Sequence, residues 1–166
     1  MGTKAYIIVK IDDADINRKC RFDATKVAHP VQIHPNQKDG LPEITLSGKY
    51  LACHHLIDSF PHYLGKELKE HYDTYDKVLN LCAGGVYDTI LGQFTYDAKP
   101  LPEGEYCVRN SLSCSSYCWD LNRPEVFANF ADLEEEMAHS VMSYAYLFEN
   151  GRWSYKLTYR SKWKPL

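Results

Sequence analysis

The sequence predicts a single α+β domain over residues 1–166, with a mainly antiparallel sheet and a few helices packed on one face. Three observations support this prediction. A chain of 166 residues suits one domain with a real hydrophobic core. Its short β-branched or alternating apolar runs are typical of strands. Segments with apolar residues at helical spacing lie between those runs, which favours helices packed against a sheet.

The first part of the chain predicts two long strands separated by a loop-rich insertion. Residues 4–11, KAYIIVKI, are apolar and β-branched and are followed by acidic residues. Proline and glycine turn signals then indicate an extended insertion at about 18–49, with short strands at 31–34 and 43–46. Residues 49–58 predict the second long strand, which we expect to pair with the first.

Two helices are predicted next in the chain. Residues 63–72 carry apolar side chains at helical spacing after the break at Pro61. Thr74 is the predicted N-cap of a second helix, and Gly84-Gly85 supplies its stop. We expect both helices to pack on the same side of the sheet.

The segment that follows the two helices has weaker signals. Residues 92–97 and 104–109 predict strands. Asp132 with Glu135 predicts the capping box of a short helix at 131–139.

The clearest element is a hairpin predicted over residues 144–159. Asn150-Gly151 separates two alternating runs, and these residue types tolerate the positive φ of a two-residue turn. The alternation predicts an aromatic face on the core and a polar face in solvent. The aromatic face comprises Tyr144, Tyr146, Phe148, Trp153, Tyr155 and Leu157, and the polar face comprises Glu149, Arg152, Ser154, Lys156 and Thr158.

The charge of the chain is small but unevenly distributed. The net charge is −3, yet five of the 19 basic residues lie in residues 152–166, where there is no acidic residue. The rest of the chain is therefore acidic, which argues against broad nucleic-acid binding. The basic residues at 152–166 are compatible with a local anion-binding site.

The compartment follows from what the sequence lacks. No apolar run is long enough to span a membrane, and the first residues lack the long apolar region of a signal peptide. Six cysteines in a chain without export signals are best interpreted as reduced thiols. We expect a cytoplasmic protein.

The stretch CHHLIDSFPH, residues 53–62, holds three histidines, a cysteine and an aspartate. On a regular strand His54 and Asp58 share one face while His55 points to the other. Adjacent histidines then cannot both enter one zinc site, so we expect neither a metal nor another cofactor. Two interpretations remain: structural histidines on a half-buried strand, or a ligand pocket in which Asp58 orients His54.

The order of elements resembles a loose family of small bacteriophage proteins. The shared features are the first strand, an aromatic-Pro step, GKEL, a helix with a Gly-rich stop and the hairpin YxYLFxNGxW. The family's Tyr-x-His-Trp-Asp-Gly-Tyr-Pro pattern matches residues 55–61, with one extra residue, Ser59 in place of glycine and no tryptophan. The resemblance covers residues 4–11, 50–91 and 143–156, and it implies a phage accessory protein that antagonises host defence.

Taken together, these features favour binding and sequestration of a small nucleotide-derived immune signal in the host cytoplasm. Tyrosines and a tryptophan can stack a base, and arginine and lysine can pair with phosphates. One alternative partner is a host defence enzyme that the protein inhibits by binding. Another alternative is a small hydrolase of a cyclic nucleotide that uses His54 or His55, and homo-oligomer formation is left open. The candidate ligand residues are His54, His55, Asp58, His62, Arg109, Arg152 and Lys156, with Arg160 as a further phosphate partner.

Overall fold

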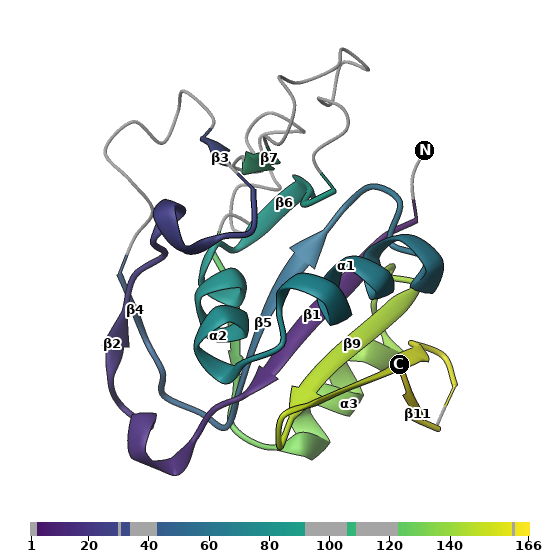
Figure 1. The fold of residues 1–166 in the computed structure, drawn as a ribbon. Coiled ribbons are helices and arrows are strands. Elements are labelled where there is room, and N and C mark those ends of the chain that lie inside the picture. Colours follow the sequence, from purple (N-terminus) through teal and green to yellow (C-terminus); the bar gives the residue numbers. More distant parts are fainter. Residues whose placement is uncertain (1–2, 30, 34–42, 92–105, 109–122, 161) are drawn as a thin grey trace, which may run out of the picture.

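The computed structural model describes residues 3–29, 31–33, 43–91, 106–108, 123–160 and 162–166. Within these residues the chain combines three α-helices with one large mixed sheet, as an α+β fold requires (Figure 1). No helix in the described ranges has both the length and the apolar character needed to cross a membrane.

The large sheet has nine strands in its described part. Eight run in the order β11-β10-β9-β1-β5-β6-β7-β3, and β8 also pairs with β5. Most pairs are antiparallel, but β1–β9, β5–β6 and β3–β7 are parallel, so the sheet is mixed. The strands are β1 (Ala5–Lys10), β3 (Val31–Ile33), β5 (Tyr50–His55), β6 (Val86–Thr89), β7 (Tyr106–Val108), β8 (Glu125–Phe127), β9 (Tyr144–Glu149), β10 (Arg152–Leu157) and β11 (Lys164–Pro165).

The predicted insertion at 18–49 is described only in part. It contains a 3₁₀ turn at Ala24–Lys26 and a small second sheet of β2 (Lys19–Cys20) and β4 (Ile44–Thr45). The strands predicted at 31–34 and 43–46 correspond to β3 and β4. The strand predicted at 104–109 corresponds to β7, and the strand predicted at 92–97 lies outside the described residues.

The centre of the sheet is β1, which lies between β5 and β9. It pairs antiparallel with β5, which confirms the predicted pairing of the two long strands, and parallel with β9. Residues 5–9 are all buried. A strand with no polar residue at these positions has to be covered on both faces.

Two helices cover one face of the sheet. A π-helical turn at Pro61–Gly65 leads into α1 (Lys66–His71), and α2 (Tyr75–Ala83) follows. Thr74 caps α2 by accepting a hydrogen bond from the Lys77 amide at 3.4 Å, as predicted. Both helices share a core with the Ile7 and Val9 side of β1, and they lie in front of the sheet in Figure 1.

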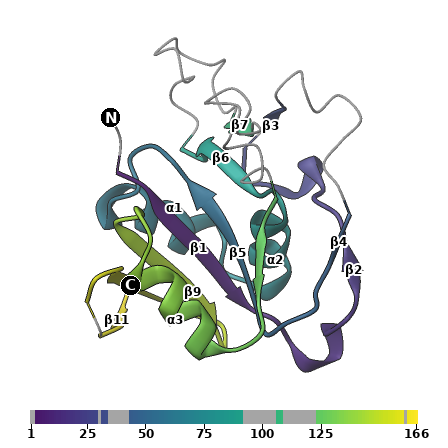
Figure 2. The ribbon, with the colours of Figure 1, turned by 180° about the vertical axis from the view of Figure 1, so that it is seen from behind.

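The third helix, α3 (Phe130–Ala138), packs on the opposite face, as the reverse view in Figure 2 shows. Its Leu133 and Met137 form a second core with Ile8 of β1 and Leu147 of β9. The prediction that the helices share one face is therefore wrong, because β1 and β9 are apolar on both sides. The predicted capping box is also wrong, since Asn129 is the N-cap and accepts from the Asp132 amide at 2.9 Å.

The β9–β10 hairpin has the predicted turn and register. Asn150 and Gly151 have φ of 53° and 75°, and Glu149 pairs with Arg152. The predicted polar face, however, is open to solvent only toward the turn, where Arg152 is exposed. Lys156 is 3% exposed and Thr158 is 7% exposed, because α3 covers this side of the sheet.

Candidate ligand-binding site

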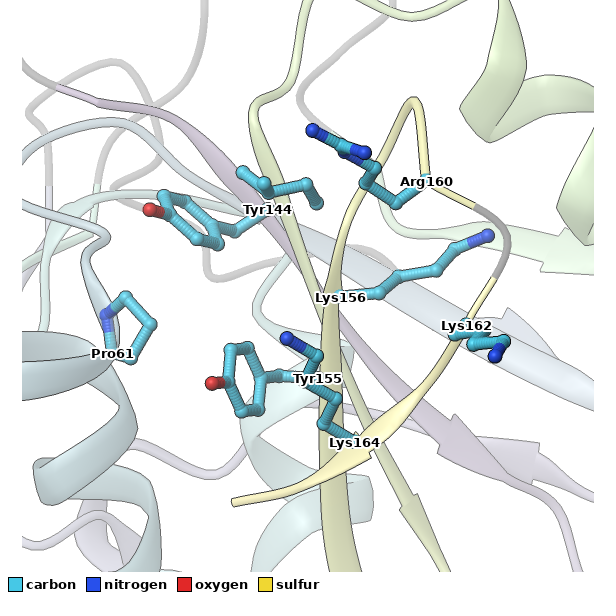
Figure 3. A pocket seen from close by; sticks show the side chains of 8 residues that line it. Pro61, Tyr144, Tyr155, Lys156, Arg160, Lys162 and Lys164 are labelled. Atoms are coloured by element: carbon cyan, nitrogen blue, oxygen red, sulfur yellow. The ribbon is translucent and has the colours of Figure 1, made fainter.

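A pocket of about 610 Å³ lies at the edge of the sheet, where the C-terminal segment returns to β10 (Figure 3). Its lining combines aromatic, apolar and basic side chains, and none of the described lining residues is acidic. The lining residues are Pro61, Tyr144, Tyr155, Lys156, Leu157, Arg160, Lys162 and Lys164.

The pocket is formed by a loop that leaves β10 and comes back as β11. Thr158 fixes the departure, because its Oγ1 donates to the Met142 carbonyl at 2.5 Å. The return is fixed by pairing of Lys164 with Tyr155. The loop between these two anchors therefore places Arg160 and Lys162 in the pocket wall.

A stack of three tyrosines forms the aromatic wall. Tyr146 lies between Tyr144 and Tyr155, with ring centroids 6.3 Å and 6.2 Å away and planes inclined by 27° and 21°. The Tyr146 hydroxyl donates to the Ser59 carbonyl at 2.6 Å, which holds the middle ring in place. The half-buried outer rings, on Tyr144 and Tyr155, are the ones that line the pocket.

One of the four basic side chains already has a charged partner. Lys156 Nζ lies 2.5 Å from Glu134 Oε2 and 5.2 Å from the ring centroid of Trp163. The Trp163 Nε1 donates to the other carboxylate oxygen of Glu134 at 3.0 Å. The charge of Lys156 is therefore balanced behind the pocket rather than offered to a ligand.

The other three basic side chains, on Arg160, Lys162 and Lys164, are exposed. Within the described ranges, no acidic residue lies at ion-pair distance from any of them. Lys164 shares the sheet face of Tyr155 because directly paired residues project to the same side. Figure 3 shows Lys164 extending toward that tyrosine. An aromatic surface and uncompensated positive charge thus occur together.

The structure places His55 in the interior. Its Nε2 accepts a hydrogen bond from the Ile90 amide at 3.0 Å, so in the neutral ring the proton is on Nδ1, 2.8 Å from Ser59 Oγ. Burial lowers the pKa of His55 to about 3. Both ring nitrogens are used inside the fold, so His55 has no free polar atom for a ligand.

His54 is also buried and lies away from the pocket. Its Nε2 is 3.3 Å from Glu125 Oε1, but neither ring nitrogen makes an aligned hydrogen bond among the described residues. β5 ends at His55, and Asp58 has φ of 55° in the following turn. The predicted sharing of a strand face by His54 and Asp58 is therefore wrong.

The remaining predicted residues lie in different places. His62 is exposed and stacks on Phe60 with ring centroids 5.6 Å apart, next to the lining residue Pro61. Arg152 is at the hairpin end of β10, and Arg109 lies outside the described residues. Two of the predicted ligand residues, Lys156 and the further phosphate partner Arg160, line this pocket in the described part of the chain.

The pocket residues missed from the sequence are chiefly Tyr144, Tyr155, Lys162 and Lys164. Two signals pointed toward them: the basic stretch at 152–166 and the aromatic face of the hairpin. Neither signal shows that the chain folds back onto β10.

Comparison with family models, with curated proteins and with solved structures finds no match. The functional conclusion therefore depends on the geometry of the pocket. Its lining offers flat rings for stacking and cationic donors for an anion.

Proposed function

We propose that this protein binds a small phosphorylated ligand of the nucleotide class in the pocket beside β10. One observation carries the proposal. Tyr144 and Tyr155 line the same pocket as three basic side chains that lack acidic partners in the described structure. Stacking of a base on an aromatic side chain contributes about 1–3 kcal/mol. A volume of about 610 Å³ lies within the usual range for small-molecule sites.

The basic side chains have different roles in the proposed recognition of the ligand. Arg160 carries a planar guanidinium that suits bidentate contact with phosphate, and Lys162 and Lys164 supply point charges beside it. The tyrosine stack receives the planar part of the ligand. Lys156 is already paired with Glu134 of α3, so it makes no direct ion pair with the ligand.

Sequestration of a host immune signal is the biological role that fits such binding. The resemblance to bacteriophage accessory proteins supplies this setting, in which a phage protein in the host cytoplasm lowers the free concentration of a nucleotide signal. The captured signal then fails to reach its effector.

Calorimetric titration tests the binding. The titrants are cyclic dinucleotides, linear nucleotides and inorganic phosphate, and the variants are Arg160→Ala and Lys164→Ala. Loss of one charge-assisted hydrogen bond costs about 1.5–3 kcal/mol, so each variant should bind roughly 10-fold to 100-fold more weakly. Arg152→Ala is the matched control, since Arg152 is an exposed basic residue at the hairpin end of β10 and does not line the pocket.

The ligand recovered after incubation distinguishes binding from hydrolysis. We expect it to be chemically unchanged in mass spectrometry. If no phosphorylated compound of the panel binds, or if Arg152→Ala weakens binding as much as Arg160→Ala, the pocket does not have this function. Expression of the protein in bacteria with a nucleotide-signalling defence should restore phage plaques, and the Arg160→Ala, Lys164→Ala double variant should not.

A further inference from the structure

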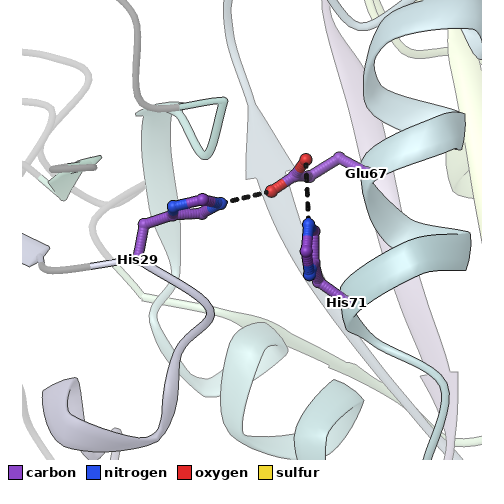
Figure 4. A group of neighbouring side chains, drawn as sticks. All are labelled: His29, Glu67 and His71. Carbon is purple, nitrogen blue, oxygen red and sulfur yellow. Dashed lines mark hydrogen bonds and ion pairs between the residues drawn. The ribbon is translucent and has the colours of Figure 1, made fainter. Parts of the chain in front are cut away.

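A second cluster of polar side chains lies between α1 and the segment that follows the Ala24–Lys26 turn (Figure 4). Glu67 and His71 are one turn apart on α1 and share a face of the helix. His29 approaches from the other segment, with its Nε2 3.0 Å from Glu67 Oε1. The His71 Nε2 lies 3.9 Å from Glu67 Oε2.

We propose that His29, Glu67 and His71 bind a divalent transition metal ion, with zinc as the best fit. Two imidazole nitrogens and one carboxylate oxygen form a ligand set that zinc accepts, and these three residues would supply three of its four tetrahedral ligands. One ligand atom from each residue lies within 4.8 Å of the others. Tetrahedral ligands of zinc are separated by about 3.3 Å, so small side-chain rotations would close the site.

The position of His29 is fixed by contacts outside the cluster. The backbone amide of the preceding residue, Ala28, donates to the Tyr72 hydroxyl at 3.4 Å. The segment is also joined to α2, because the Asp23 amide donates to Asn80 Oδ1 at 2.8 Å and Asn80 Nδ2 donates to the Asp23 carbonyl at 3.0 Å. The segment therefore holds His29 opposite α1 before any ion arrives, which lowers the entropic cost of assembling the site.

The exposure of the three side chains gives a metal ion access to the site from solvent. The Glu67 side chain is only 14% exposed, while those of His29 and His71 are 32% and 41% exposed. The carboxylate thus lies at the base of the site and the imidazoles at its rim. The two rings meet nearly edge to face, with centroids 5.4 Å apart.

This site is independent of the proposed nucleotide pocket and shares no lining residue with it. It is also separate from residues 53–62, and it departs from the expectation that the protein holds no metal. A bound ion would join the 24–29 segment to α1, so the metal should stabilise the folded state as well as occupy the site.

Zinc binding to protein first stripped with a chelator tests the proposal. After dialysis against micromolar zinc under reducing conditions, elemental analysis should give one equivalent per chain, and the melting temperature should rise. Removing an outer partner of a metal ligand typically weakens affinity about 10–100-fold, so His29→Ala and His71→Ala should lose at least that much. His139→Ala is the control, because His139 is exposed and is the C-cap of α3, on the opposite face of the sheet.

The variants also separate this site from binding by thiols, since the chain has six cysteines. Both substituted histidines are partly exposed, so the variants should fold, which circular dichroism checks directly. If the wild type binds no zinc, or if both histidine variants retain the wild-type affinity, the proposal is wrong.

Discussion

The buried His55 makes the stability of the protein depend on pH in a defined direction. The pKa of this imidazole is about 3 in the folded protein because burial disfavours its charged form, whereas an unfolded histidine titrates near 6.5. Between these values the unfolded chain takes up the proton and the folded chain does not. The free energy of unfolding should therefore fall as the pH drops below about 6.5.

The size of the effect follows from the two pKa values. For one such group, lowering the pH from 7 to 5 should reduce the free energy of unfolding by about 2 kcal/mol. Over this range the folded imidazole stays neutral, since pH 5 is well above its pKa. The result therefore depends mainly on protonation of the unfolded chain.

Urea unfolding of the wild type and of His55→Gln at both pH values measures this contribution. The Gln side-chain oxygen can accept the Ile90 amide hydrogen bond, so the fold should be retained at lower overall stability. The other six histidines are present in both proteins, and their effects cancel in the comparison. We expect the wild type to lose about 2 kcal/mol more than the variant between pH 7 and 5. Equal losses would refute the reasoning and show that His55 can be protonated in the folded state.

Three further substitutions test the hairpin, the part-buried Lys156–Glu134 ion pair and the third helix by chemical denaturation. Gly151→Val should lower the free energy of unfolding by roughly 1–3 kcal/mol through the positive φ alone, since a Cβ at this position meets no atom within 4 Å. An unchanged denaturation midpoint would rule out the strained turn. Glu134→Ala should cost about 1–3 kcal/mol because it removes the partner of the buried Lys156 charge, whereas the double change with Lys156→Met should recover most of that loss. No recovery would mean that Glu134 acts mainly through Trp163. Asn129→Ala should cost about 1 kcal/mol through loss of the α3 cap, and a smaller effect than that of Asp132→Ala would contradict the assigned N-terminus.

The elements predicted correctly are those whose signals are local. The Asn150-Gly151 turn and the Thr74 cap depend on neighbouring residues, so their chemistry can be recognised within a few positions of the sequence. The same holds for the apolar runs of β1 and β5. Periodicity also revealed the aromatic face of the hairpin, because alternation along a strand is itself a local property.

The elements missed depend on contacts between distant parts of the chain. Alternation shows that Lys156 and Tyr155 point to opposite sides of β10, but it does not show that α3 will cover the Lys156 side. The apolar run Tyr144–Phe148 carried the missing signal, since five such residues in a row are typical of a strand buried on both faces. The candidate sites were harder still, because the approach of His29 to Glu67 is set by tertiary structure.

The position of β1 between β5 and β9 has a consequence for how the protein is made. Ala5, near the start of the chain, pairs with Tyr144, and no nearer segment supplies that partner. On the ribosome, β1 and β5 can form a hairpin-like pair early, but one edge of β1 stays open until residues 144–149 have emerged. Such distant pairing slows folding and leaves an apolar strand edge exposed to other chains during synthesis. Emergence of residues 144–149 is thus the step at which β9 can cover the open edge of β1.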